Sequence, residues 1–239
     1  MTIPFYGTLI FWAGLLFGGF VFGKPNADQT KRIPTLNRLG SSLALVLAGW
    51  SLYFLHRGTL IESYALLVAL GMTAGFVGDL FMAVENIIGG MGAFGVGHIL
   101  YSIAFLGGLQ IVRTLNPETP AVFAPLAVWL VIGVVAWYVI MFRGKTALPQ
   151  VMRFAGLGYA LLLTGMAGVA WSLAFSVPPF FPLAIGAALF VISDLIIAGQ
   201  IFAGWRFPLI GDLIWLTYGP AQALIVLSVG TARVLALIS

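Results

Sequence analysis

Four ionisable side chains lie inside long apolar runs of the sequence: Asp79, His98, Asp194 and Asp212. Carboxyl and imidazole groups donate and accept protons, so together they can act as general acid and general base at one reaction centre. An ionisable group in the middle of a membrane costs about 3 kcal/mol or more, and it is retained there mainly for function. These four residues are therefore the candidate catalytic residues.

The rest of the chain is too apolar for a soluble protein. Of its 239 residues, 61% are hydrophobic and only 8% are charged, and the mean hydropathy is +1.09, whereas roughly a quarter of the residues of a globular domain are charged. A disordered chain is excluded as well. The absence of cysteine excludes disulfides, a thiolate nucleophile and Cys-ligated metal. We expect no cofactor. The thinly spread net charge of +4 indicates no nucleic-acid partner, and the sequence implies no protein partner.

Eight apolar segments are long enough to cross a membrane. A transmembrane helix needs about 20 apolar residues, and these runs are continuous, which favours helices over the alternating strands of a β-barrel. The predicted fold is all-α, a polytopic membrane bundle of eight transmembrane helices in a single domain, 1–239. The expected spans are 3–22, 39–55, 61–84, 91–112, 121–142, 154–175, 180–203 and 208–232.

The four candidate residues lie at similar depths in these spans. Counted from the span ends, they lie on the order of 6 to 14 Å from one and the same membrane face. Gly71 and Gly75 share a helix stripe with Asp79. Because small residues let helices approach closely, we expect that stripe to face a neighbouring helix and not lipid.

A weak internal repeat relates the same positions. The segment GDLFMA at 78–83 resembles SDLIIA at 193–198, and GHIL at 97–100 resembles GDLI at 211–214. Four spans separate the copies, so two parallel four-helix repeats would bring the four side chains together. We therefore expect them to line one cavity. The two halves of this possible repeat are 1–112 and 121–239.

Basic residues are distributed unequally between the two ends of the spans. Eight basic residues lie on the side of the membrane that holds the loops after spans 1, 3, 5 and 7. Three basic residues lie on the opposite side. Because basic residues are enriched on the cytoplasmic side, we expect both termini outside and the candidate residues in the cytoplasmic half of a bacterial membrane. The eight are Lys24, Lys31, Arg32, Arg38, Arg143, Lys145, Arg153 and Arg206, and the three are Arg57, Arg113 and Arg233.

Two stretches around these residues resemble the YhhN family of integral membrane proteins, whose members include the lysoplasmalogenases. They are GDLF at 78–81 followed by GAFGVGHILY at 92–101, and GAALFVISD at 186–194. The resemblance implies hydrolysis of the vinyl ether bond of lysoplasmalogens, which yields a fatty aldehyde and a glycerophospho-base. It also implies that Asp79 and Asp194 are the leading catalytic residues.

Hydrolysis of a vinyl ether suits a pair of carboxyl groups. The β-carbon is protonated first, and water then captures the resulting oxocarbenium ion as a hemiacetal. A carboxylic acid and a carboxylate do the equivalent work in glycoside hydrolysis. His98 would orient or share the proton, and Asp212 would complete the network. The sequence leaves open which aspartate is the acid.

A lysophospholipid also needs an apolar groove for its chain and a cation for its phosphate. Arg153 and Arg206 lie on the side of the carboxyl groups, and arginine can bind phosphate through two parallel hydrogen bonds. Tyr101 shares a helix face with His98, and we expect it to contact the substrate. The expected partners are therefore a lysophospholipid and membrane lipid.

Other interpretations of the same residues stay open. Intramembrane Asp and His residues also form proton relays in transporters, and a lipid-binding protein would need no catalysis. Each aspartate could serve helix packing alone, Arg153 and Arg206 could be interfacial anchors, and Trp137 could belong to an interfacial aromatic belt. No HxxxH or HxxE spacing supports a metal site. An enzyme differs from a carrier in having a cavity that does not open alternately to both faces.

Overall fold

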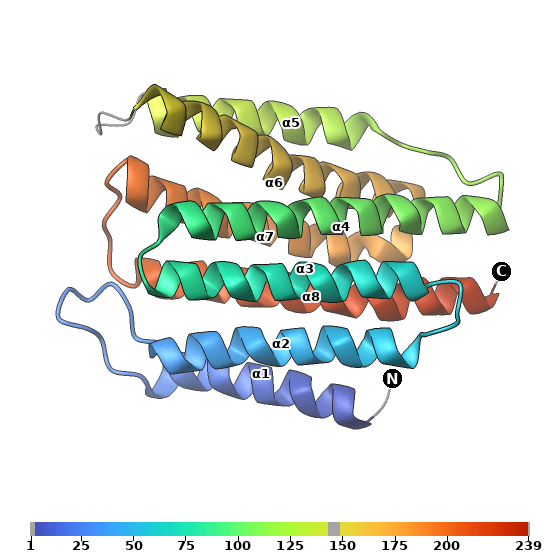
Figure 1. Ribbon diagram of the computed structural model, residues 1–239, viewed down its shortest axis with the longest axis horizontal. Coiled ribbons are helices and arrows are strands. Elements are labelled where there is room, and N and C mark those ends of the chain that lie inside the picture. The colour runs from blue at the N-terminus through green and yellow to red at the C-terminus, as the bar shows by residue number, and fades with distance from the viewer. Residues whose placement is uncertain (1–2, 143–148, 239) are drawn as a thin grey trace.

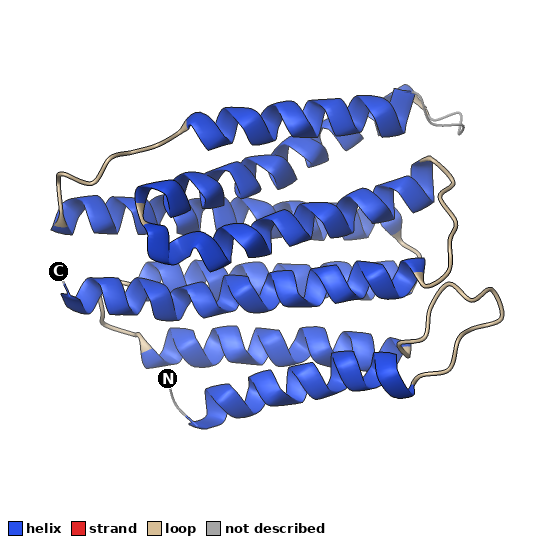
Figure 2. Ribbon diagram, turned by 180° about the vertical axis from the view of Figure 1, so that it is seen from behind, coloured by secondary structure: helices blue, strands red, loops and turns tan. Residues whose placement is uncertain are grey.

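The computed structural model of the chain describes residues 3–142 and 149–238, with side chains described for 5–142 and 149–233. Within these residues every regular element is a helix (Figure 2), and eight helical segments are long and apolar enough to cross a membrane. The predicted all-helical fold of eight spans is therefore confirmed. The elements are α1 (Ile3–Phe22), α2 (Thr35–Leu55), α3 (Glu62–Ala83), α4 (Ile87–Leu115), α5 (Ala124–Trp137), the π-helix η1 (Tyr138–Phe142), α6 (Gln150–Ser176), the 3-10 helix η2 (Pro178–Phe180), α7 (Phe181–Phe202) and α8 (Ile210–Ile238).

Several helices extend beyond the apolar segments predicted from the sequence. Helices α4 and α8 have 29 residues each and α6 has 27. The extension of α4 begins after Asn86, whose side-chain oxygen accepts a hydrogen bond from the backbone N–H of Gly89 at 2.9 Å. Hydropathy marks only the part of a helix that lies in hydrocarbon, while the backbone hydrogen bonds continue into the polar interface.

Consecutive helices run antiparallel, so the connections alternate between the two ends of the bundle (Figure 1). The loops 23–34, 84–86 and 203–209 lie at one end, and the start of α1 and the end of α8 lie at the other. Helices α1 and α5 are peripheral. In each of them 17% of the apolar membrane-spanning segment is buried, compared with 44 to 56% in the other six helices. The six others form the interior of the bundle.

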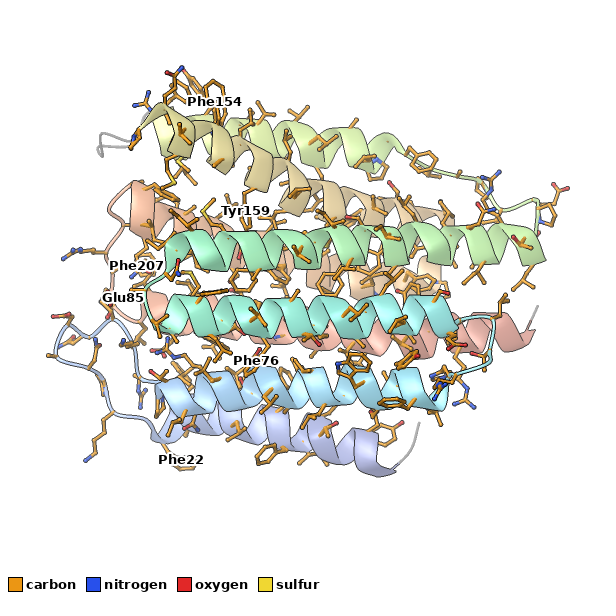
Figure 3. The ribbon with its side chains drawn as sticks, viewed as in Figure 1. Phe22, Phe76, Glu85, Phe154, Tyr159 and Phe207 are labelled. Carbon is orange, nitrogen blue, oxygen red and sulfur yellow. The ribbon has the colours of Figure 1, made fainter. Side chains whose placement is uncertain are left out.

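The surface of the bundle is apolar, and its interior contains hydrogen-bonded polar side chains. Ile10, Phe22 and Val131 expose 74%, 85% and 62% of their surface, and apolar side chains cover the outside of the helices in Figure 3. An exposed apolar surface of this extent is stable only in the hydrocarbon core of a membrane. The chain is therefore a multi-pass membrane protein.

The small-residue stripe of α3 faces protein, as predicted. Gly71 lies against the ring of Tyr101 on α4, and a Cβ at Gly75 would lie 2.7 Å from Nε2 of Gln222 on α8. A Cβ at Gly97 on α4 would lie 3.3 Å from the carbonyl oxygen of Gly71. These close approaches fix the relative positions of three helices that carry candidate residues.

Two sequence predictions lie beyond these observations. The internal repeat of 1–112 and 121–239 stays a prediction. Arg143 and Lys145, two of the eight basic residues used for orientation, lie outside the described residues.

Candidate active site

Asp194 lies in the interior of α7 and is bonded to a tyrosine that the sequence analysis did not single out. Its carboxylate accepts a hydrogen bond from the hydroxyl of Tyr159 on α6, and Asp194 is 7% exposed. Nε2 of His98 on α4 lies 3.9 Å from Oδ2 of Asp194 and 3.4 Å from the Tyr159 oxygen. We call these three residues the Asp194 cluster. Helices α4, α6 and α7 each contribute one member.

The imidazole of His98 has one nitrogen without a partner. Both oxygen atoms near Nε2 accept hydrogen bonds, which favours the tautomer with hydrogen on Nε2. Nδ1 is buried and has no hydrogen-bond partner within the described part of the chain. The ring of Phe190 packs on the imidazole with 4.9 Å between centroids. The histidine is thus held rigidly and keeps one free acceptor.

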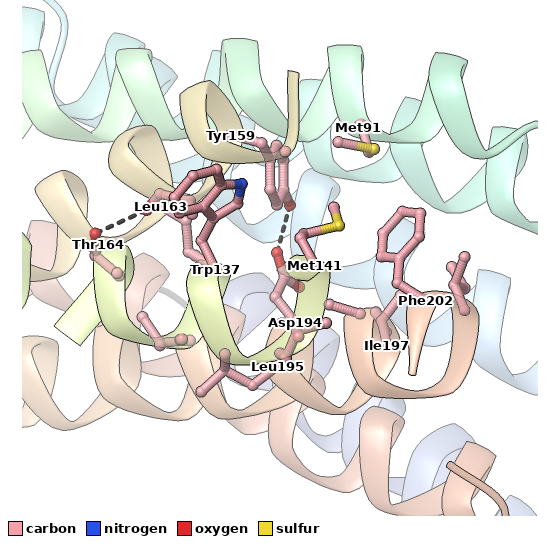
Figure 4. Close-up of a pocket in the computed structure, with 18 of the residues that line it drawn as sticks. Met91, Trp137, Met141, Tyr159, Leu163, Thr164, Asp194, Leu195, Ile197 and Phe202 are labelled. Carbon is pink, nitrogen blue, oxygen red and sulfur yellow. Dashed lines mark hydrogen bonds between the residues drawn. The ribbon is translucent and has the colours of Figure 1, made fainter. Parts of the chain in front are cut away.

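The Asp194 cluster borders a large apolar groove. The groove encloses about 820 Å³ of empty space, including its open part, and helices α3 to α7 and η1 line it. Asp194 and Tyr159 form part of its wall, and Figure 4 shows them facing each other among apolar side chains. The hydroxyl of Thr164 is another polar group of the wall, and it donates to the carbonyl oxygen of Ala160 at 2.7 Å. A carboxyl group thus borders a space with apolar walls.

The π-helix η1 shapes one side of this groove. Ile140 and Met141 from η1 line it together with Trp137, the last residue of α5. Turns of π-helix are wider than α-helical turns and recur at functional sites. Trp137 is therefore a wall residue of the groove, whereas its place near a span end predicted an aromatic belt.

Asp79 belongs to a different hydrogen-bonded group, which we call the Asp79 network. Its Oδ2 accepts from the hydroxyl of Ser42 on α2 at 2.5 Å and from that of Tyr218 on α8 at 3.0 Å. Nε2 of Gln222 donates to the Tyr218 oxygen at 3.0 Å, and Tyr101 donates to Oε1 of Gln222 at 2.8 Å. The network thus connects α2, α3, α4 and α8 in the interior.

Aromatic rings separate the Asp79 network from the Asp194 cluster. The ring of Phe190 lies 4.9 Å from that of His98 on one side and 5.2 Å from that of Tyr218 on the other. Phe94 packs on both Phe190 and Tyr218. Asp79 is not part of the groove wall. The expectation of one cavity for all four residues is therefore wrong, because of the four only Asp194 lines the groove and the ring of Phe190 packs between His98 and Tyr218.

Asp212 is engaged by the backbone of the loop 23–34. It is fully buried, its Oδ2 accepts from the backbone N–H of Arg32 at 2.6 Å, and its Oδ1 accepts from that of Ile33 at 2.8 Å. Its place in the first turn of α8 explains this role, because a carboxylate there can bind backbone amides of a neighbouring loop. Asp212 therefore belongs neither to the groove wall nor to the hydrogen-bonded groups of Asp79 and Asp194.

The three residues predicted to bind substrate lie in three different environments. Tyr101 is 1% exposed and belongs to the Asp79 network, away from the groove. Arg153, in the first turn of α6, lines a second cavity that adjoins the groove at Trp137. Arg206 is exposed in the loop 203–209 and is not a wall residue of the groove.

Four residues of these two groups were missed by reasoning from charge: Ser42, Tyr159, Tyr218 and Gln222. Gln222 offered the clearest signal, because an amide in the middle of an apolar span needs a partner. Tyr159 and Tyr218 offered less, since tyrosine is common in membrane helices. Ser42 offered none, since serine can bond its own helix backbone.

Comparison with known proteins agrees with the sequence resemblance. The sequence model of the YhhN family matches residues 37–229, which is most of the chain. No curated protein and no solved structure matches it. The matched segment contains both the Asp194 cluster and the Asp79 network.

Proposed function

The chain belongs to the YhhN family, and on this premise we propose that it is an intramembrane lipid hydrolase that cleaves the vinyl ether bond of lysoplasmalogen. The observation behind this proposal is the position of Asp194, a carboxyl group hydrogen-bonded to Tyr159 beside His98 in the wall of an apolar groove. The groove fits the alkenyl chain, and the carboxyl group supplies the proton that the reaction needs.

In the proposed mechanism Asp194 acts first as an acid and then as a base. The protonated carboxyl group transfers its proton to the β-carbon of the vinyl ether, and the ether oxygen stabilises the resulting oxocarbenium ion. Water adds to this ion while the Asp194 carboxylate removes the proton of the water. The hemiacetal then separates into a fatty aldehyde and a glycerophospho-base, so protons and atoms balance.

The neighbouring residues have supporting roles in this proposal. Tyr159 orients the carboxyl group of Asp194 through its hydrogen bond, and the Nε2–H of His98 faces the same carboxyl oxygen at 3.9 Å and helps to hold its orientation. Asp79 has an indirect role. It accepts a hydrogen bond from Tyr218, whose ring packs on Phe190, and Phe190 in turn packs on His98. Proton transfer to the substrate is assigned to Asp194 because it is the aspartate that lines the groove.

Deuterium incorporation tests this mechanism directly. Purified protein turning over lysoplasmalogen in deuterated water is expected to release aldehyde with one deuterium on the carbon next to the carbonyl. The aldehyde must be trapped at once, because exchange through its enol would add label. Aldehyde without deuterium at that carbon would exclude protonation of the β-carbon, and no aldehyde at all would exclude this substrate.

Proton-coupled transport is the second candidate function. The continuous hydrogen bonds from Asp79 through Tyr218 and Gln222 to Tyr101 favour it, since such chains relay protons in carriers. Proton transport across the membrane of proteoliposomes that contain the protein, with no aldehyde released, would favour this alternative over hydrolysis.

We also propose that both termini lie outside a bacterial cytoplasmic membrane, so that the groove lies in the cytoplasmic half. The support is the excess of basic residues at the end of the bundle that holds loops 23–34 and 203–209.

A further inference from the structure

A second cavity lies beside the groove at the start of α6. It encloses about 530 Å³ including its open part, and its wall consists of Trp137, Phe142, Gln150, Arg153 and Phe154. Trp137 is also part of the groove wall, so the two spaces adjoin. In Figure 3 Phe154 lies at the end of the bundle and Tyr159 lies deeper along the same helix. The cavity is therefore at the membrane interface, beside the apolar groove.

Arg153 is the cation of this cavity, and its neighbours hold it in place. Its guanidinium carbon lies over the ring of Phe142, 5.0 Å from the centroid. Its backbone oxygen accepts a hydrogen bond from Nε1 of Trp137 at 2.8 Å, which ties the start of α6 to the end of α5. Nε of Arg153 is buried and has no hydrogen-bond partner among residues 3–142 and 149–238. A buried donor of this kind requires an acceptor.

The charges around Arg153 leave it available for an anion. Within the described residues it forms no ion pair with a carboxylate. Its positive charge is therefore not paired with a carboxylate in the described part of the chain, and arginine can bind a phosphate through two parallel hydrogen bonds.

The spacing along α6 matches a lysophospholipid. Arg153 precedes Tyr159 by six residues, which corresponds to about 9 Å along the helix axis. Tyr159 marks the level of the reactive carboxyl group, because it bonds to Asp194. In a 1-alkenyl glycerophospholipid about six covalent bonds separate the vinyl ether from the phosphorus, a reach on the order of 7 Å. A lipid with its phosphate at Arg153 would thus present its ether bond near Asp194.

We propose that this cavity is the head-group subsite of the protein, in which Arg153 binds the phosphodiester of a lysophospholipid and Gln150 lies beside it. This inference rests on the proposed function for the position of the chain in the groove, but it concerns binding alone. Arg206, the other arginine predicted to bind phosphate, lies in an exposed loop outside the cavity.

Equilibrium binding of two ether lipids without a vinyl group tests the subsite. One is a 1-O-alkyl lysophosphoethanolamine and the other is the matching 1-O-alkylglycerol, which lacks the phosphate. The wild-type protein is expected to bind the phospholipid at least about tenfold more tightly, since hydrogen bonds to charged groups have this magnitude. Arg153→Gln is expected to remove the difference, and Arg153→Lys to reduce it, because lysine keeps the charge without the two parallel donors.

Lys24→Gln is the matched control, because Lys24 is an exposed cation at the same end of the bundle and lies outside both cavities. It is expected to keep the full preference. Equal affinity of the wild type for the two lipids, or an unchanged preference in a folded Arg153→Lys or Arg153→Gln variant, would overturn the subsite. Competition by inorganic phosphate at the concentration of the lysolipid would instead indicate a free-anion site and also overturn it. Neither lipid can be hydrolysed at a vinyl ether, so the outcome is independent of whether lysoplasmalogen is the substrate.

Discussion

At the scale of single residues, the three buried aspartates differ in what surrounds their oxygen atoms. Asp212 uses both oxygen atoms for backbone amides. Asp79 accepts two hydroxyl groups in the interior of the bundle. Asp194 accepts one hydroxyl and faces an apolar groove. Of the three, Asp194 is the one that lines the groove.

Replacing this carboxyl group is expected to abolish hydrolysis without unfolding the protein. Asp194→Asn keeps the shape and an acceptor for Tyr159, but it cannot transfer a proton. Aldehyde release should fall by about a hundredfold or more, and Tyr159→Phe should lower it by a smaller factor, since the carboxyl group loses only its orienting bond. Release from purified, monodisperse protein measures both effects.

A substitution in the Asp79 network is expected to affect stability more and the rate less than the substitution of Asp194. Asp79→Asn should lower thermal stability and reduce the rate less than Asp194→Asn, because the Ser42 and Tyr218 hydroxyls lose part of a shared acceptor. Ser102→Ala serves as the control, since the Ser102 hydroxyl bonds only to the carbonyl oxygen of His98 in its own helix. A fully active Asp194→Asn protein, or a greater loss in Asp79→Asn, would move the proton transfer away from Asp194.

The sequence predicted the depth of these residues and not their directions around each helix. Asp79 and Asp194 do lie in the same half of the bundle, four and eight residues before the ends of α3 and α7. Their separation depends on where Phe94 and Phe190 pack. Apolar residues occur on every face of a membrane helix, so hydropathy cannot tell which of them fills the centre.

At the scale of elements, the helices were predictable where they cross hydrocarbon and not where they continue beyond it. Helix α6 starts at Gln150, four residues before the expected span, and this extra turn contains Arg153. The π-helix η1 was not predicted either, since its sequence YVIMF is as apolar as any other span end. Residues of η1 line the groove and residues of the extra turn line the second cavity, so charge and hydropathy pointed to the candidate residues better than to the walls around them.

The contact between α8 and the loop 23–34 leads to a prediction about stability. Asp212→Ala leaves the backbone amides of Arg32 and Ile33 without their acceptor. Each lost bond to a charged group should lower the free energy of unfolding by about 1.5 to 3 kcal/mol, while the rate per folded molecule stays within about twofold. Thermal unfolding and aldehyde release in the same preparation measure both. Loss of activity at unchanged stability would show that Asp212 takes part in the reaction.

At the scale of the whole molecule, the two ends of the bundle differ in charge. Loops 23–34 and 203–209 lie at the end with most of the basic residues (Figure 1). Arg57 follows α2, and Arg113 and Arg233 lie near the ends of α4 and α8, so these three lie towards the other end. The Asp194 cluster and the cavity of Arg153 are displaced towards the basic end. A phosphate that enters from the leaflet at this end of the bundle would therefore meet Arg153 before its chain reaches Asp194.

This orientation can be tested with single cysteines, because the natural chain has none. Asp28 and Glu118 are exposed in loops 23–34 and 116–123, at opposite ends of the bundle. In Asp28→Cys and Glu118→Cys the basic residues that determine orientation are unchanged, and acidic residues contribute little to it. A membrane-impermeant maleimide added to intact cells should label the cysteine at 118, whereas the one at 28 should react only after the membrane is opened. The reverse pattern would mean that the orientation is inverted and that the groove lies in the outer half of the membrane. Labelling of both from one side would contradict the span count itself, because α2, α3 and α4, an odd number of spans, separate the two loops.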